Sequence, residues 1–193
     1  VSARSVSSAV PLRKIGQQAL TGPQRIITVE DRQAFIDDVR DALWSAKVVA
    51  YAQGLDEIRT AAAEYHWEVD MGQVASIWRA GCIIRARLLQ RIKDEYASGD
   101  LTTLLEAPSV KAELARCQQA WRRVVARAVE AGVPVPGFSS ALSYYDQVRA
   151  PRLNAALTQG LRDLFGAHTY RRVDDEGSWH VNWSGDGREV RAD

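Results

Sequence analysis

Residues 31–66 read DRQAFIDDVRDALWSAKVVAYAQGLDEIRTAAAEYH, and this stretch decides the fold. Apolar or small residues recur in it at every third or fourth position: Phe35, Val39, Leu43, Ala46, Ala50 and Gly54, with Ile36, Ala42 and Val49 beside them. That spacing places them on one face of an α-helix. No proline interrupts the stretch, and Thr28 followed by Asp31 three residues later has the pattern of a capping box. The sequence therefore predicts one long helix that crosses the whole domain.

Helical spacing of apolar residues recurs in further segments, namely 71–79, 82–97, 109–131 and a last one from Ser139 or Ser140 to Gly166. Asp70 suits the N-cap of the first of these helices, and Gly132 marks the end of the third. Pro151 lies inside the last segment, where it should kink or break the helix. Because no convincing run of strands separates these helices, we expect an all-α fold, a large multi-helix domain over residues 1–166.

The composition changes after Gly166. Residues 169–193 are rich in Asp, Gly, Arg and Trp, with a short alternating piece at 179–183. They contain too few aliphatic side chains to form a core of their own, so the segment is either disordered or docked on another surface. Its tryptophans favour docking, because Trp is enriched at interfaces. We assign residues 167–193 to an extended C-terminal tail and expect His180 to pack against a partner.

Length and composition exclude several classes of protein. The 193 residues allow one core of ordinary size, and 46% hydrophobic with 25% charged residues is typical of a soluble globular protein. A formal net charge of +1 gives no bulk electrostatic reason to expect nucleic acid or an anionic membrane as a partner. No apolar run reaches the roughly 20 residues that span a bilayer. We interpret Cys82 and Cys117, far apart in the chain, as reduced thiols of a cytosolic protein.

Common catalytic motifs are missing from the sequence. It contains no G-x-G-x-x-G after a strand, no Walker loop and no H-E-x-x-H, and its three histidines fit no zinc-site spacing, so we expect no metal. The segment 79–86 resembles a corner between two helices with solvated arginines, and the apolar neighbours of Cys82 do not favour a reactive thiolate. The first residue is not Met, which suggests either a start inside a longer polypeptide or N-terminal processing.

Arg162 and His168 are the residues most suggestive of a binding site. Arg162 lies near the end of the last predicted helix, and His168 lies just beyond the glycine that ends it. One interpretation is structural, with two cations near the C-terminal carbonyls of the helix. The other is an anion clamp, in which the planar guanidinium binds a phosphate or carboxylate in bidentate fashion and the imidazole adds a donor. Their position before the tail suggests a site that another polypeptide completes.

Five short motifs resemble the C-terminal half of 6-phosphogluconate dehydrogenases, and they occur in the order found in that family. They are YAQG at 51–54, WRAGCIIR at 78–85, PVP at 134–136 followed by Phe138 and Ser139, YYD at 144–146 and FGAHTY at 165–170. The resemblance covers essentially the whole chain. It implies an NADP-dependent (in some members NAD-dependent) oxidation of 6-phosphogluconate and decarboxylation to ribulose 5-phosphate, a step of the pentose phosphate pathway.

The resemblance also implies a domain organisation for the whole polypeptide. The family has an N-terminal Rossmann-type cofactor domain, a large helical domain, and a tail that inserts into the second subunit of a homodimer, and it needs no metal. Its lysine general base and glutamate general acid lie upstream of this chain. Three residues carry over by motif as substrate-phosphate ligands: Arg4, and from the other subunit Arg162 and His168.

The chain departs from the family pattern at three places: Ser2, where an aromatic residue is common, Asn154, where a proline is frequent, and Gly160-Leu161, where a small polar residue and glutamine precede the arginine. The departure at Gly160-Leu161 affects how the Arg162 side chain is oriented. Two hypotheses follow. The chain is the substrate-binding and dimerisation part of a 6-phosphogluconate dehydrogenase, inactive without the Rossmann domain, or it is a non-catalytic helical assembly protein on the same scaffold.

Overall fold

The computed structural model describes residues 2–81 and 86–192, and the chain falls into two compact units, Val1–Tyr145 and Asp146–Asp193. Helices dominate the described residues, and the only strands among them form one short hairpin, so the predicted all-α fold is confirmed. The boundary between the compact units falls inside a helix, Pro136–Arg149. The domain boundary at Gly166 that the sequence suggested stays a prediction.

The first unit contains a series of helices that differ greatly in length. In chain order they are α1 (Ser2–Ser8), α2 (Val10–Ala19), α3 (Arg32–Glu64), α4 (Met71–Gly81), α5 (Arg87–Ser98), the short 3₁₀ turn η1 (Leu104–Glu106), α6 (Pro108–Glu130) and the start of α7 (Pro136–Arg149). The predicted long helix is confirmed as α3. Of the predicted segment 82–97, residues 82–85 lie outside the described part, and α5 begins at Arg87.

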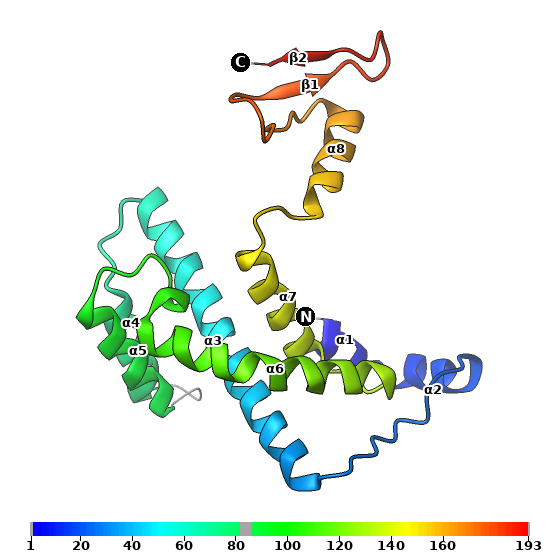
Figure 1. The fold of residues 1–193 in the computed structure, drawn as a ribbon, viewed down its shortest axis with the longest axis vertical. Coiled ribbons are helices and arrows are strands. Elements are labelled where there is room, and N and C mark those ends of the chain that lie inside the picture. The colour runs from blue at the N-terminus through cyan, green and yellow to red at the C-terminus, as the bar shows by residue number, and fades with distance from the viewer. Residues whose placement is uncertain (1, 82–85, 193) are drawn as a thin grey trace. The chain divides into compact units, whose positions relative to one another are not determined.

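The core of the first unit lies where α3 packs against α6, and α4 packs on α5 beside it (Figure 1). Small residues of α3, such as Ala46 and Ala52, allow α6 to approach closely, and both are buried. Trp121 of α6 fills the centre of this contact with no exposed surface. Its indole Nε1 donates to the carbonyl of Phe138 over 3.1 Å, which satisfies the one polar group that the ring brings into the core.

The buried face of α3 differs in part from the predicted stripe. Ala42, Ala46 and Val49 are buried as expected, whereas Leu43 is 56% exposed and Ala50 also faces outward. The buried positions instead include Ser45, Val48, Ala52 and Leu55. Periodicity alone identifies a helix and a broad apolar sector, but the small residues that allow close packing against α6 decide which edge of that sector is covered.

The N-terminus of α3 is capped by a different residue from the one predicted. Asp31, not Thr28, is the N-cap, and its carboxylate accepts a hydrogen bond from the backbone N–H of Ala34 over 3.0 Å. The predicted cap of α4 is confirmed, since Asp70 Oδ1 accepts from Gln73 N over 2.9 Å. Thr28 lies in the extended segment before the helix, too early in the chain for its hydroxyl to reach a free N–H of the first turn.

Asp31→Ala is expected to lower the free energy of unfolding by about 1 kcal/mol, the usual cost of losing an N-cap side chain. Thr28→Ala is the matched control and should leave stability unchanged within about 0.5 kcal/mol, since it removes no cap. Urea denaturation followed by circular dichroism measures both. Equal losses for the two variants, or a loss at Thr28 alone, would restore the capping box suggested by the sequence.

The second unit contains α8 (Ala155–Gly166) and a hairpin of β1 (Trp179–Val181) and β2 (Glu189–Arg191). The predicted last helix is therefore broken: α7 ends at Arg149 and α8 begins at Ala155, with Pro151 in the break as expected. The strands are antiparallel, with Trp179 opposite Arg191 and Val181 opposite Glu189. Gly166 ends α8 as predicted.

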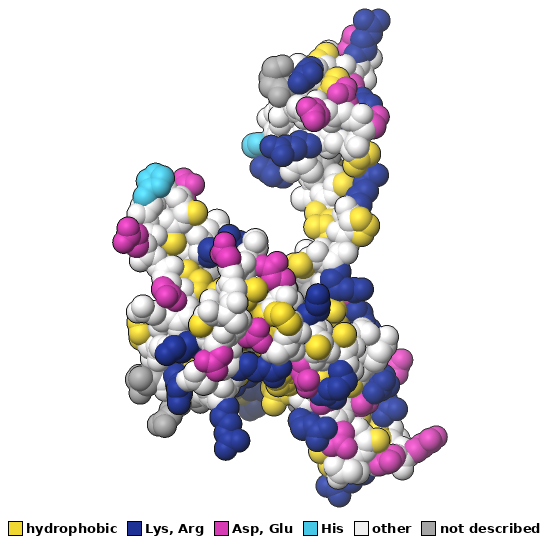
Figure 2. All heavy atoms as spheres, turned by 60° about the vertical axis from the view of Figure 1, so that its left-hand side comes forward, with side chains coloured by type: hydrophobic (Ala, Val, Ile, Leu, Met, Phe, Trp, Pro, Cys, Tyr) yellow, Lys and Arg dark blue, Asp and Glu magenta, His cyan; other side chains and the backbone are white. Residues whose placement is uncertain are grey.

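The surface carries charges of both signs. Figure 2 shows acidic and basic side chains interspersed over the visible face of the helical unit, in keeping with the formal net charge of +1. Among the described residues, none of the helices has the length and apolarity that a membrane crossing requires.

Candidate functional site at the end of α8

A buried carboxylate organises the second unit. Asp163 lies on α8 and has no exposed surface, which is rare for a charged side chain that lacks partners. Its Oδ1 accepts from the backbone N–H of Thr169 over 3.0 Å and contacts His180 Nδ1 at 2.8 Å. Its Oδ2 accepts from Val181 N over 3.1 Å and from Trp183 Nε1 over 2.8 Å. One carboxylate therefore joins the helix, the following corner and the first strand of the hairpin.

The charge state of Asp163 follows from two opposing effects. Burial by itself would raise the pKa of Asp163, because it removes the charged form from water. Hydrogen bonds from His180, Val181 and Trp183 stabilise the carboxylate, and together they lower the pKa to about 2. Asp163 is thus ionised at neutral pH, and its negative charge holds the donors of the tail on α8.

The hairpin has further polar contacts of its own. Tyr170 and Trp179 exchange both backbone hydrogen bonds at 2.8 Å, which aligns the segment after α8 with β1. The guanidinium of Arg172 lies 5.1 Å from the centre of the Trp179 ring and pairs with Asp174 and Glu189. The tail is therefore ordered by a buried anion and a cation–π contact rather than by an aliphatic core, consistent with its composition.

The corner that follows α8 has an unusual backbone. Ala167 and Thr169 both have left-handed φ angles, 52° and 58°, so His168 lies between two residues of left-handed backbone. The Ala167 N–H donates to the Asp163 carbonyl over 2.9 Å, and the Thr169 N–H donates to the Asp163 side chain. Gly166 gives the imidazole room, since a Cβ there would lie 3.1 Å from two atoms of the His168 ring. Local hydrogen bonds and this close approach determine where His168 lies.

At this corner the structure connects Arg162 with the backbone of His168 and Thr169 through the side chain of Gln159. Arg162 Nη1 donates to Gln159 Oε1 over 3.0 Å, and Gln159 Nε2 donates to the Thr169 carbonyl over 2.6 Å and, more weakly, to that of His168 over 3.5 Å. Both predicted site residues are exposed. The arginine thus pairs with a side chain rather than with the helix-end carbonyls that the structural interpretation invoked. Two nitrogen-rich side chains are exposed at a hydrogen-bonded corner, an arrangement suited to an anion.

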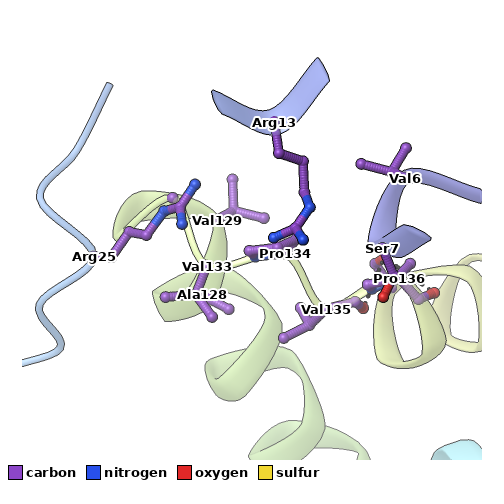
Figure 3. Close-up of a pocket in the computed structure, with 12 residues that line it drawn as sticks. Val6, Ser7, Arg13, Arg25, Ala128, Val129, Val133, Pro134, Val135 and Pro136 are labelled. Carbon is purple, nitrogen blue, oxygen red and sulfur yellow. Dashed lines mark hydrogen bonds between the residues drawn. The ribbon is translucent and has the colours of Figure 1, made fainter. Parts of the chain in front are cut away.

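Arg4 lies in the first unit, on α1, and is exposed. Among the described residues it has no ion pair. An open pocket of about 850 Å³ lies beside α1, lined by Val6, Ser7, Arg13, Arg25, Ala128, Val129, Gly132, Val133, Pro134, Val135, Pro136 and Ser139. Figure 3 shows the Arg13 side chain reaching toward Pro134 and the Arg25 side chain toward Val129. The described lining is apolar and basic, with no acidic residue, and Arg4 is not part of it.

Sequence reasoning missed two residues of the α8 cluster and did not foresee a contact of a third within its own chain. Asp163 and Gln159 were not singled out, because nothing in the local sequence distinguishes them from exposed polar residues of a helix. His180 was expected to pack against a partner, but its ring contacts Asp163 of its own chain. Only the fold reveals this contact, because the two residues are separated by the whole corner and turn.

Two further features concern the cysteines and the side chains that could bind a metal. Cys82 lies outside the described residues, whereas Cys117 is a buried free cysteine, and burial raises the pKa of its thiol, consistent with an unreactive reduced sulfur. Within the described ranges, no group of three or more His, Cys, Asp or Glu side chains is arranged to hold a metal ion.

Comparison with known proteins identifies close relatives. A family model for the 6-phosphogluconate dehydrogenase C-terminal domain matches residues 1–183. The decarboxylating 6-phosphogluconate dehydrogenases of Salmonella typhimurium and of Escherichia coli K12 are 49% and 48% identical over 184 residues, and each alignment covers 95% of this chain. The corresponding enzyme of Synechococcus elongatus is 47% identical over the same length.

A solved structure gives the same result at the level of the fold. The Plasmodium falciparum 6-phosphogluconate dehydrogenase, studied in its apo form and in complex with NADP⁺ and with 6-phosphogluconate, superposes with a TM-score of 0.85 at 34% identity over 94% of this chain. The chain spans 39% of the length of that protein and of the bacterial relatives. On sequence and fold together, the chain belongs to the 6-phosphogluconate dehydrogenase family and carries its C-terminal domain.

Proposed function

We propose that this chain is the substrate-binding and dimerisation part of an NADP-dependent 6-phosphogluconate dehydrogenase, which oxidises 6-phosphogluconate and decarboxylates it to ribulose 5-phosphate. The observation that carries the proposal is the exposure of Arg162 and His168 at one hydrogen-bonded corner, in a chain that matches the family over residues 1–183. The domain supplies no proton-transfer residue. A lysine base and a glutamate acid, which the family uses, would lie in the part of the relatives that precedes this match.

The role assigned to Arg162 and His168 is to bind the phosphate of the substrate. A phosphate dianion accepts hydrogen bonds on three oxygens, and a guanidinium offers a planar pair of donors that matches two of them. An imidazole N–H serves the third. Arg4, on α1, would add a second guanidinium. With two subunits, Arg162 and His168 of one copy would reach the phosphate that Arg4 of the other copy binds.

The cofactor would be bound elsewhere in the polypeptide. None of the 13 glycines of the chain forms the G-x-G-x-x-G pattern in which backbone N–H groups approach a dinucleotide pyrophosphate. The residues of this domain therefore do not fit NADP by themselves, and hydride transfer is assigned to the preceding part of the enzyme. No metal is required for the binding chemistry proposed for Arg4, Arg162 and His168.

Exposed apolar side chains on α8 support a homodimer whose tail inserts into the neighbouring subunit. Leu157 and Phe165 are 73% and 82% exposed, and Leu161 and Leu164 continue the same face of the helix. An apolar stripe of this kind favours burial against another polypeptide. The reduced, buried Cys117 and a substrate of central metabolism fit a cytoplasmic location.

The alternative is a helical assembly protein without catalytic function. The two proposals differ first in the mass of the native polypeptide. We expect the purified native protein to have an intact mass more than twice the 21.4 kDa of this chain, because the relatives are that much longer. A native protein of only this mass that forms dimers and does not reduce NADP⁺ would support the assembly protein.

Arg162→Ala in the native protein is expected to raise KM for 6-phosphogluconate by roughly 10- to 100-fold, because a charged hydrogen bond to phosphate is worth about 1.5–3 kcal/mol. Steady-state NADPH formation measures this. Arg171→Ala is the matched control, since Arg171 is an exposed arginine of the same unit, and its KM should stay near the original value. An unchanged KM for Arg162→Ala would remove the phosphate role from Arg162.

A further inference from the structure

We propose that Gln159 is a positioning residue that holds the Arg162 guanidinium against the corner bearing His168. This inference rests on the function proposed above for Arg162 and His168. Gln159 lies one turn before Arg162 on α8, on the same side of the helix. It is half-buried, whereas Arg162 and His168 are exposed.

Both the oxygen and the nitrogen of the Gln159 side-chain amide form hydrogen bonds. Oε1 accepts from Arg162 Nη1 over 3.0 Å, and Nε2 donates to the carbonyl of Thr169 over 2.6 Å. A longer contact of 3.5 Å joins Nε2 to the carbonyl of His168. The Arg162 side chain lies on the helix and the Thr169 carbonyl lies beyond its end, and the side chain of Gln159 connects the two.

The corner itself is held from a second side. The Thr169 N–H donates to the buried Asp163 carboxylate, while its carbonyl accepts from Gln159, so both faces of this segment are fixed. The left-handed φ angles of Ala167 and Thr169 are costly for residues with a Cβ, and such conformations persist where surrounding contacts maintain them. Asp163 fixes the corner on the helix, and Gln159 then fixes Arg162 relative to the corner.

Only an amide of this length satisfies both contacts. Glutamate would keep the acceptor for Arg162, but its second oxygen would face the Thr169 carbonyl with no donor between them. It would also place a negative charge beside the guanidinium, where it competes with a phosphate. Methionine keeps the length and the helical preference but offers neither a donor nor a strong acceptor. Because Arg162 has a long, flexible side chain, loss of Gln159 Oε1 allows its guanidinium to leave its position beside the corner that follows α8.

Kinetics of the native enzyme test this role through a double-mutant cycle with Gln159→Met, Arg162→Ala and the combined variant. Gln159→Met is expected to raise KM for 6-phosphogluconate about five- to tenfold, with kcat changed less than about twofold, as expected when one hydrogen bond that orients a charged ligand group is lost. The increase in the combined variant should be clearly smaller than the product of the two single increases, because Gln159 acts through Arg162.

Two further measurements separate positioning from folding. Gln159→Glu should raise KM at least as much as Gln159→Met while the thermal midpoint stays close to that of the original protein, since Glu and Gln are similar helix formers. Thr158→Val, at the exposed neighbouring position on α8, is the control and should leave KM unchanged. A raised KM with an unchanged thermal midpoint cannot come from a folding defect.

The outcomes distinguish failure of the positioning role from failure of the proposed function. If Arg162→Ala raises KM and neither Gln159 variant does, the positioning role is overturned and the phosphate role of Arg162 stands. If the two single effects multiply in the combined variant, Gln159 acts independently of Arg162, and the proposal is also wrong. If KM is insensitive to Arg162→Ala itself, the function proposed for the pair fails first.

Discussion

Trp121→Ala is expected to destabilise the first unit more than any other single truncation, lowering its free energy of unfolding by about 3–5 kcal/mol. The indole of Trp121 is fully buried between α3, α6 and α7. Its ring centre lies 6.1 Å from that of Tyr145, and its N–H donates to the Phe138 carbonyl. Truncation leaves a large cavity and also an acceptor without its partner, so the two costs add.

Guanidinium denaturation followed by far-UV circular dichroism measures the loss. Trp67→Ala is the matched control, because Trp67 is 59% exposed and stacks only on Tyr65. We expect it to change stability by less than about 1 kcal/mol. A Trp121→Ala midpoint close to that of Trp67→Ala would show that the α3–α6 contact does not depend on this ring.

Asp163→Asn is expected to release the hairpin from α8 while leaving the first unit folded. Four donors converge on the two oxygens of Asp163, so an amide NH₂ in place of one oxygen would face donors that it cannot accept from. Because this substitution removes a buried, charged acceptor, we expect the amide hydrogens of Val181 and Thr169 to exchange on the order of a hundredfold faster. Hydrogen exchange with mass spectrometry measures this.

Asp175→Asn provides the control for the tail, because Asp175 is exposed and accepts only from the backbone N–H of Glu176. In the Asp175→Asn variant, the amide hydrogens of Val181 and Thr169 should exchange at the same rate as in the original chain. Protection at Val181 that survives Asp163→Asn would mean that strand pairing alone holds the hairpin in place.

The same carboxylate predicts an acid transition of the tail. The pKa of Asp163 is about 2 in the folded chain, below the value of about 3.9 for an exposed aspartate. A group whose pKa is lowered by folding stabilises the fold above its unfolded pKa, and that contribution is lost as pH falls through the folded pKa. We therefore expect docking of the hairpin to be complete above about pH 5 and to weaken toward pH 2, with Asp163→Asn lacking this dependence.

The helices could be predicted because their determinants are local. The spacing of apolar residues in α3, the cap at Asp70, the break at Pro151 and the ends at Gly132 and Gly166 all depend on residues within a turn or two of each other. Predictions that required knowledge of a packing partner were less accurate. Leu43 belongs to the apolar sector of α3 by spacing, yet it is exposed because α6 covers the adjacent edge.

The residues around the end of α8 show the same difference between local and tertiary information. Arg162 and His168 were found from the sequence because they flank a helix end and match a family motif, which is local information. Asp163 and Gln159 were not, since each acts by contacting groups beyond the turn that follows α8. Likewise, the pocket beside α1 joins residues from α2, the following loop and the end of α6, and no spacing pattern connects these segments.

The helical class of the chain, the ends of most helices and the family resemblance could all be predicted from the sequence, because caps, breakers and short motifs act over a few residues. The tertiary structure alone decided which face of α3 is buried, that Asp163 binds the tail of its own chain, and that Gln159 connects Arg162 to the corner at His168. Those outcomes depend on which polar and apolar groups meet after the chain has turned, and a carboxylate or amide has the same appearance in the sequence whether or not four donors later converge on it.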